Sequence, residues 1–184
     1  MKKLVTLITI LLVGTAVFAQ VGTVTGTERI PVNANTNLIT FQEVVQLEGT
    51  KDAHFNRASE WLHNYFLQPV YVTQVRDAES GLIKGKHQFE IYFYEDDVKK
   101  RAGVIKYYFK IECKDNRYRY TIDNFLLTQA SKYPCERWLD KTSRDYNEQW
   151  DDYLEQIRAY ALEDFAANLK EYMVPPVVVE EEEW

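Results

Sequence analysis

Hydrophobic and polar residues alternate through the middle of the chain, a pattern typical of strands that bury one face. In an extended strand, successive side chains point to opposite faces, so a period of two marks a half-buried sheet. Runs of this kind end at glycines or at clusters of Asp and Asn, which favour turns. We expect five strands, at residues 41–48, 70–81, 82–94, 103–113 and 117–127.

Two other stretches repeat hydrophobic residues every three to four positions and therefore predict helices. Residues 52–66 place Phe55, Trp61 and Leu62 on one side of a helix, and Pro69 prevents its continuation. Residues 143–173 predict a long helix with Ser143 as its N-cap. Its apolar stripe comprises Tyr146, Trp150, Tyr153, Leu154, Ile157, Tyr160 and Ala161.

The order of these elements, β-α-β-β-β-β-α, predicts an α+β fold. We expect an antiparallel sheet of about five strands, because Lys114, Asp115 and Asn116 form a short hairpin turn between the last two strands. Residues 95–103 are polar and predict a longer loop at the end of the sheet. Both helices should cover the one apolar face. The alternative is a helix-grip fold with a ligand cavity between the sheet and the long helix.

The stretch 114–125, KDNRYRYTIDNF, alternates arginine and tyrosine in a way that also occurs on nucleic-acid-binding strands. The strand period puts Tyr118, Tyr120, Ile122 and Leu126 on one face, and the neighbouring strands divide in the same way. The alternation is therefore explained by a buried face and a wet face, without a ligand.

The wet face collects basic and aromatic residues in an otherwise acidic protein. It is a candidate docking face for an acidic protein or envelope partner, or for residues 180–183 of the chain itself, and the alternative is an ordinary solvated surface. The candidate residues are Lys84, Lys86, Tyr92, Lys106, Tyr108, Lys110, Arg117 and Arg119.

The ends of the chain differ from this middle part. Residues 1–19 combine two lysines, an apolar run and a small-residue cleavage site after Ala19, as in a secretory signal peptide. The apolar run is shorter than the roughly 20 residues of a spanning helix, so we expect a periplasmic or secreted protein without a transmembrane segment after cleavage. Residues 20–40 predict a flexible leader arm, 41–173 a single domain and 174–184 an acidic tail.

Composition supports a packed core and argues against nucleic acid as a partner. The chain has 184 residues, of which 46% are hydrophobic and 14% aromatic, enough to fold. Loss of Lys2 and Lys3 with the signal peptide would leave 20 basic residues against 28 acidic ones, a net charge of −8. Such a chain is not a general binder of polyanions.

No motif in the sequence indicates catalysis, a cofactor or a metal. His54 and His63 fall on opposite sides of the first helix, and His87 faces inward, where a lone histidine is usually a satisfied core residue. Cys113 and Cys135 are a candidate disulfide if the compartment is oxidising, and otherwise free thiols. We therefore expect a non-catalytic binding module; the alternative is a small-ligand-binding protein or a hydrolytic enzyme whose site the sequence does not reveal.

The segments DAHFNRASEWL, at the start of the first helix, and KDNRYRYTIDNF, at the last hairpin, occur in the predicted order of elements. Together they resemble a domain-of-unknown-function family, family 4468, found mostly in secreted or envelope proteins of Bacteroidetes-type bacteria. The resemblance covers about residues 41–172 and implies a fold like that of the TATA-binding protein. It implies no catalytic residues and no DNA binding, because one fold hosts unrelated functions.

Overall fold

A computed structural model describes residues 30–129 and 132–176 of the chain. The long helix is continuous through three segments, α3 (Gln149–Ala159), η2 (Tyr160–Ala166) and α4 (Ala167–Met173), of which η2 is π-helical. The elements are β1 (Thr40–Gln46), α1 (Lys51–Tyr65), α2 (Pro69–Val72), β2 (Thr73–Asp77), β3 (Leu82–Glu95), β4 (Val98–Lys114), β5 (Arg117–Thr128), β6 (Lys132–Pro134), the 3₁₀ helix η1 (Cys135–Leu139), α3 (Gln149–Ala159), η2 (Tyr160–Ala166) and α4 (Ala167–Met173).

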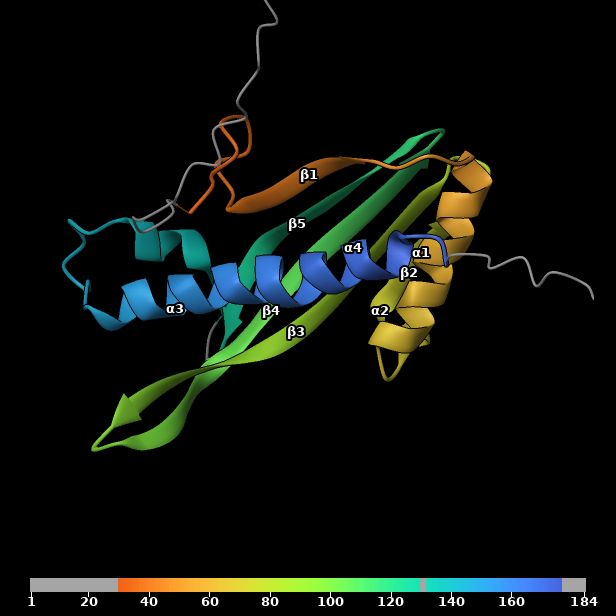
Figure 1. Cartoon of the computed structure of the whole chain (residues 1–184). Coiled ribbons are helices and arrows are strands. Elements are labelled where there is room, and N and C mark those ends of the chain that lie inside the picture. Colours follow the sequence, from red (N-terminus) through yellow and green to blue (C-terminus); the bar gives the residue numbers. More distant parts are fainter. Residues whose placement is uncertain (1–29, 130–131, 177–184) are drawn as a thin grey trace, which may run out of the picture.

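The strands form one antiparallel sheet in the order β1-β5-β4-β3-β2, with the short β6 paired to β5 (Figure 1). The predicted α+β class and the antiparallel pairing are confirmed. The described residues form six strands rather than about five, because the three residues of β6 were not recognised as a strand in the sequence.

Both helical layers pack on the same face of the sheet. Trp61 of α1 and Phe165 of the long helix each contact the ring of Phe109 on β4, with ring centroids 6.4 and 5.3 Å away. Figure 1 shows the long helix crossing the strands, with α1 lying across its end. The aromatic side chains predicted to face inward therefore form the core, and the opposite face of β3, β4 and β5 carries the polar residues.

The hairpin between β3 and β4 is longer and tighter than predicted. Only Asp96 and Asp97 connect the two strands, both with positive φ (52° and 60°), so they form a two-residue turn that matches the strand twist. Val98 and the charged residues 99–101 belong to β4 rather than to a loop. Their side chains are exposed, which is why the sequence looked like a loop there.

The strand predicted to begin at Val70 begins instead at Thr73. Pro69 occupies the first turn of the short helix α2, a position where its missing N–H costs nothing. α1 ends at Tyr65, before Pro69, and the proline starts a new helical turn instead of preceding a strand. As a result, β2 has only five residues and pairs with β3 no further than Gly85.

One residue predicted to lie in the core lies on the opposite face. Asn124 has a positive φ of 54°, and the pairing of β5 with β4 shifts by one residue next to it. This bulge reverses the alternation in the rest of the strand. Phe125 and Leu127 are buried, while Leu126 lies on the outer face opposite Lys106.

The long helix begins at Gln149, six residues after the predicted N-cap. Ser143 lies in a series of turns, where its N–H donates to the carbonyl of Asp140. At the other end of the domain, packed structure starts before residue 41, because Ile39 is fully buried. The predicted signal peptide and residues 177–184 of the predicted tail lie outside the described residues. No helix of the described part is long and apolar enough to cross a membrane.

Candidate functional site

A cavity of about 950 Å³ opens at the edge of the sheet, beyond the point where Thr73, the first residue of β2, pairs with Gly85 of β3. Beyond Gly85, β3 is the edge strand, and the cavity lies between this edge, the α1–α2 turn and the π-helical segment. Its lining combines both faces of β3 and β4 with the helices. The lining residues are Tyr65, Phe66, Leu67, Gln68, Tyr71, Val72, Lys86, His87, Gln88, Lys106, Tyr107, Tyr108, Leu126, Tyr160 and Asp164.

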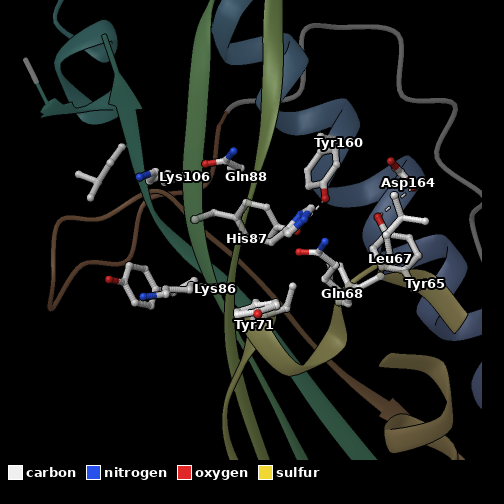
Figure 2. A pocket seen from close by; sticks show the side chains of 15 residues that line it. Tyr65, Leu67, Gln68, Tyr71, Lys86, His87, Gln88, Lys106, Tyr160 and Asp164 are labelled. Atoms are coloured by element: carbon white, nitrogen blue, oxygen red, sulfur yellow. Dashed lines mark hydrogen bonds between the residues drawn. The ribbon is translucent and has the colours of Figure 1, made fainter. Parts of the chain in front are cut away.

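Three tyrosines and one carboxylate form the polar wall of this cavity, and Figure 2 labels Tyr65, Tyr160 and Asp164 of this group. The hydroxyls of Tyr107 and Tyr160 lie 2.7 Å apart, and the hydroxyl of Tyr65 donates to Oδ1 of Asp164 at 3.0 Å. Burial raises the pKa of all three tyrosines above the ordinary value. They are therefore neutral hydrogen-bonding groups at any physiological pH.

His87 contributes a buried polar atom without a hydrogen-bond partner to the lining of the cavity. Its ring packs against Phe66, with centroids 4.9 Å apart, and Figure 2 shows it pointing toward Tyr160. Its Nδ1 is buried and has no hydrogen-bond partner in the part of the chain that the structure describes. Burial lowers the pKa of the imidazole, which favours the neutral ring. The sequence predicted a satisfied core histidine; the side chain does face inward, but β2 ends before it and leaves it in a cavity.

Apolar side chains form the rim of the cavity on the helix side. Leu67 is fully exposed (103%), and Tyr71 is 79% exposed. Val70, in the same short segment, is also exposed. Contiguous apolar side chains in water mark a surface that contacts a ligand or a partner. None of these residues stood out in the sequence, because an apolar run after a proline fits a buried strand equally well.

The opposite rim is basic. Lys86 of β3 and Lys106 of β4 line the cavity from the outer face of the sheet, and Lys84 lies two residues before Lys86 on β3. Within the described ranges, none of the three forms an ion pair with an acidic side chain. An anionic group at this rim would therefore meet unneutralised charges.

The other residues of the predicted docking face are less free to bind an acidic partner at the cavity. Lys110 and Arg119 share the carboxylate of Glu112, at 3.0 and 2.6 Å, so their charges are partly neutralised. Tyr92 lies further along β3, where its hydroxyl donates to Glu90. Tyr108 is opposite Lys86 and lines the cavity, whereas Arg117 lies at the far end of the hairpin, opposite Lys114. The face is thus divided: in the described ranges Lys84, Lys86 and Lys106 form no ion pair with an acidic side chain, and of these Lys86 and Lys106 line the cavity.

The two cysteines are free, buried and far apart, so the candidate disulfide is wrong for this structure. Cys113 pairs with Tyr118 at one end of β5, whereas Cys135 follows Pro134, which pairs with Leu126 near the other end. The eight-residue separation along β5 corresponds to roughly 25 Å at ~3.3 Å per residue. A disulfide needs Cα atoms within about 7 Å, so the predicted meeting across the hairpin does not occur.

The remaining candidates for chemistry do not converge. His54 is buried against the carbonyl of Leu47, whereas His63 is exposed on the same helix and contacts the carbonyl of Ser59. The described part of the chain contains no cluster of three His, Cys, Asp or Glu side chains that could hold a metal ion.

Solved structures with the same architecture define the class of protein: an α+β domain of the TBP-like fold. A TBP-like protein from Parabacteroides distasonis superposes with a TM-score of 0.63 and 16% identity, over 78% of this chain and 96% of that one. A DUF4468 family protein from Bacteroides ovatus gives 0.63 and 15%, over 80% and 91%. At these identities the likeness shows the fold alone.

The sequence also matches a family model. Residues 41–127 match the model of the domain of unknown function (DUF4468) with TBP-like fold. The resemblance predicted from the two sequence segments is therefore confirmed, although the match ends at β5 and leaves out the long helix. A search of curated proteins finds no match.

Proposed function

We propose that this protein is a non-catalytic binding module whose site is the cavity at the edge of β3. One observation carries the proposal: a cavity large enough for a ligand is joined to exposed apolar side chains, Leu67 and Tyr71, and contains a buried histidine nitrogen without a partner. Binding pockets typically combine apolar walls with a few polar groups that fix orientation.

The groups in the cavity suit recognition better than catalysis. Tyr65, Tyr107 and Tyr160 are held in the neutral form by burial, and a neutral phenol is a weak nucleophile and a weak base. The thiols of Cys113 and Cys135 do not line the cavity. The polar wall can donate and accept hydrogen bonds without being consumed in a reaction.

We further propose that the protein acts outside the cytoplasm, in the periplasm or as a secreted protein. Support comes from the first 19 residues, which have the length, charge and cleavage site of a signal peptide. Mass spectrometry of the protein isolated from its own cells tests this: a mature chain that starts at Gln20 is expected. A chain that retains residues 1–19 in the cytoplasmic fraction would contradict it.

Capture of envelope proteins tests the binding site. The mature chain, residues 20–184, would be immobilised and incubated with an envelope extract of the source bacterium. We expect the double substitution Leu67→Ser and Tyr71→Ser to lose what the wild-type chain retains. The matched control is Tyr94→Ser and Val98→Ser, which removes two exposed apolar side chains at the tip of the β3–β4 hairpin. Equal capture by wild type and both variants would overturn the proposal.

A further inference from the structure

The side-chain amide of Gln156 pairs with the backbone of Tyr92 in the way that a neighbouring strand would. The N–H of Tyr92 donates to Oε1 of Gln156 at 2.9 Å, and Nε2 of Gln156 donates to the carbonyl oxygen of Tyr92 at 2.8 Å. The backbone of Tyr92 therefore points away from β4, toward the open edge of β3. At this one residue, a side chain of the long helix forms the backbone hydrogen bonds that a neighbouring strand would form.

The alternation of an antiparallel strand extends this orientation along β3. If the backbone of Tyr92 faces the open edge, the backbones of Glu90, Gln88 and Lys86 face it too, two residues apart. The extra residue of the nearby bulge, Ala102, belongs to β4, so it leaves the alternation of β3 unchanged.

The pairing of β2 ends at Gly85, so the edge from Lys86 to Glu90 has no strand partner within the described part of the chain. The gap between β2 and Gln156 is therefore about one short strand long.

We propose that an extended peptide of a partner protein fills this gap, continuing the line of β2 and pairing with β3. The inference rests on the proposed binding site and specifies its ligand. Main-chain hydrogen bonds to an exposed sheet edge supply affinity, and pockets for alternate side chains supply specificity. The cavity adjoins the unpaired edge, as this mode of recognition requires.

The two sides of β3 select different side chains in this peptide. A peptide residue opposite His87 points to the inner side and enters the cavity, where aromatic walls and the unpaired Nδ1 favour an aromatic side chain with a hydroxyl, such as tyrosine. Residues opposite Lys86 and Gln88 point to the outer side. Lys86 is adjacent there, and Lys106 pairs across from Gln88 on β4. Acidic side chains on either side of the tyrosine are therefore favoured.

The lysines also argue against a second copy of this chain as the occupant. Lysine on an edge strand is a known device against such self-association. An acidic peptide instead neutralises the same charge.

A synthetic peptide tests the inference directly. The probe is the fluorescein-labelled peptide Gly-Thr-Thr-Glu-Tyr-Glu-Thr-Thr, titrated with the mature chain and followed by fluorescence anisotropy. The matched control has the same side chains but carries N-methyl groups on both glutamates, whose backbones would face β3. Because it cannot form those hydrogen bonds, we expect its affinity to be lower by about tenfold or more.

Substitutions at Gln88 provide the same contrast on the protein side. Gln88→Pro removes a backbone donor at the edge, where proline is tolerated within sheets. Gln88→Thr changes the side chain but keeps the donor. We expect Gln88→Pro to reduce binding of the parent peptide by about tenfold and Gln88→Thr to retain it. Circular dichroism verifies that both variants are folded, and the N-methyl control gives an independent answer if Gln88→Pro is not.

Three outcomes would overturn the inference. Equal binding of the parent and N-methylated peptides would mean that the peptide does not pair with β3 as a strand. If the double substitution Leu67→Ser and Tyr71→Ser still weakens the binding of both peptides, the proposed binding site stands without strand pairing. No binding of either peptide at millimolar concentration would exclude this ligand, and the envelope capture experiment would then judge the site separately. Binding that appears only when a Gly-Ser segment replaces residues 177–184 would show that the chain's own tail is the occupant.

Discussion

The hydroxyl groups of Tyr107 and Tyr160 lie 2.7 Å apart, joining the centre of the sheet to the π-helical segment of the long helix. Tyr160 is also hydrogen-bonded to Tyr65, which in turn donates to Asp164. Each of these tyrosines has one hydroxyl proton. That is sufficient for a continuous chain of hydrogen bonds in which Tyr107 donates to Tyr160, Tyr160 to Tyr65 and Tyr65 to the carboxylate of Asp164. The polar wall of the cavity thus also fixes the long helix on the sheet.

This chain of hydroxyls predicts unequal effects of two similar substitutions. Tyr160→Phe leaves the hydroxyl of Tyr107 buried without a partner, which should lower the free energy of unfolding by about 1–3 kcal/mol. Tyr107→Phe removes that hydroxyl and leaves Tyr160 bonded to Tyr65, so a loss of about 1 kcal/mol or less is expected. Urea denaturation of both variants measures the difference. A larger loss for Tyr107→Phe would contradict the proposed order of hydrogen bonds.

Burial of Tyr107 also predicts a loss of stability at alkaline pH. Its pKa is raised in the folded protein by desolvation first and by Tyr160 second, whereas an unfolded tyrosine titrates near 10. Above about pH 10 the unfolded chain loses this proton while the folded chain keeps it, so the free energy of unfolding falls as the pH rises toward the folded-state pKa. Denaturation between about pH 8 and 11 should show a shallower decline for Tyr107→Phe than for wild type. Identical slopes would contradict this.

Gly85, the last residue of β3 paired with β2, should not tolerate a side chain. A Cβ atom there would lie 2.3 Å from Cζ of Phe109 and 2.8 Å from the carbonyl oxygen of Val72. We expect Gly85→Ala to destabilise the fold by about 1–3 kcal/mol through overpacking, measured by thermal or urea denaturation.

Two further variants define the cause of that loss. The exposed Gln88→Ala on the same strand should change stability by no more than ~0.5 kcal/mol. Adding Phe109→Leu to Gly85→Ala should cost less than the two separate effects combined, since the shorter side chain relieves the contact. Additive losses would mean that another contact limits this position.

The sequence predicted the elements whose pattern is local and repeated. Alternation fixed the inward faces of Tyr118, Tyr120 and Ile122, and the turn residues at Asp115 and Asn116 indicated the hairpin, all as observed. It failed where one backbone angle decides the outcome. The positive φ of Asn124 reverses the face of Leu126, and no pattern of polarity reveals such a bulge in advance.

The candidate site was only half predictable. The lysines of the outer face were recognised because charge periodicity is visible in a sequence. The cavity was not, because it exists only where β2 stops short of His87, and the length of β2 depends on Pro69 starting a helix instead of preceding a strand. The local signal there, a proline followed by an apolar run, fits a buried strand and a short exposed helix equally well.

The separation of Cys113 from Cys135 predicts two slow, independent thiols. Burial raises the pKa of Cys113 to about 12 and that of Cys135 further in the same direction, so little thiolate forms at neutral pH. In the native protein we expect negligible reaction of either thiol with iodoacetamide at about pH 8, and labelling of both after unfolding in urea without reductant. A mass lower by two hydrogens, with no labelling after unfolding, would instead reveal a disulfide.

Charge reversal distinguishes the free lysines of the outer face from the paired ones. Lys84, Lys86 and Lys106 have no acidic partner in the described ranges, whereas Lys110 and Arg119 share Glu112. Replacing the first three by glutamate should weaken binding of the acidic probe peptide by about tenfold at low salt, and raising the salt from about 20 to 300 mM should weaken wild-type binding, because exposed charges are screened.

The matched control for charge reversal neutralises the paired cations, Lys110→Gln with Arg119→Gln. Their field is already offset by Glu112, so we expect a smaller loss of peptide affinity than for the triple variant. Stability of both variants should change little, since exposed ion pairs contribute at most about 1 kcal/mol. Fluorescence anisotropy at the two salt concentrations makes the comparison. If the triple variant binds the peptide as tightly as wild type at low salt, the three lysines are solvated surface rather than part of the binding site.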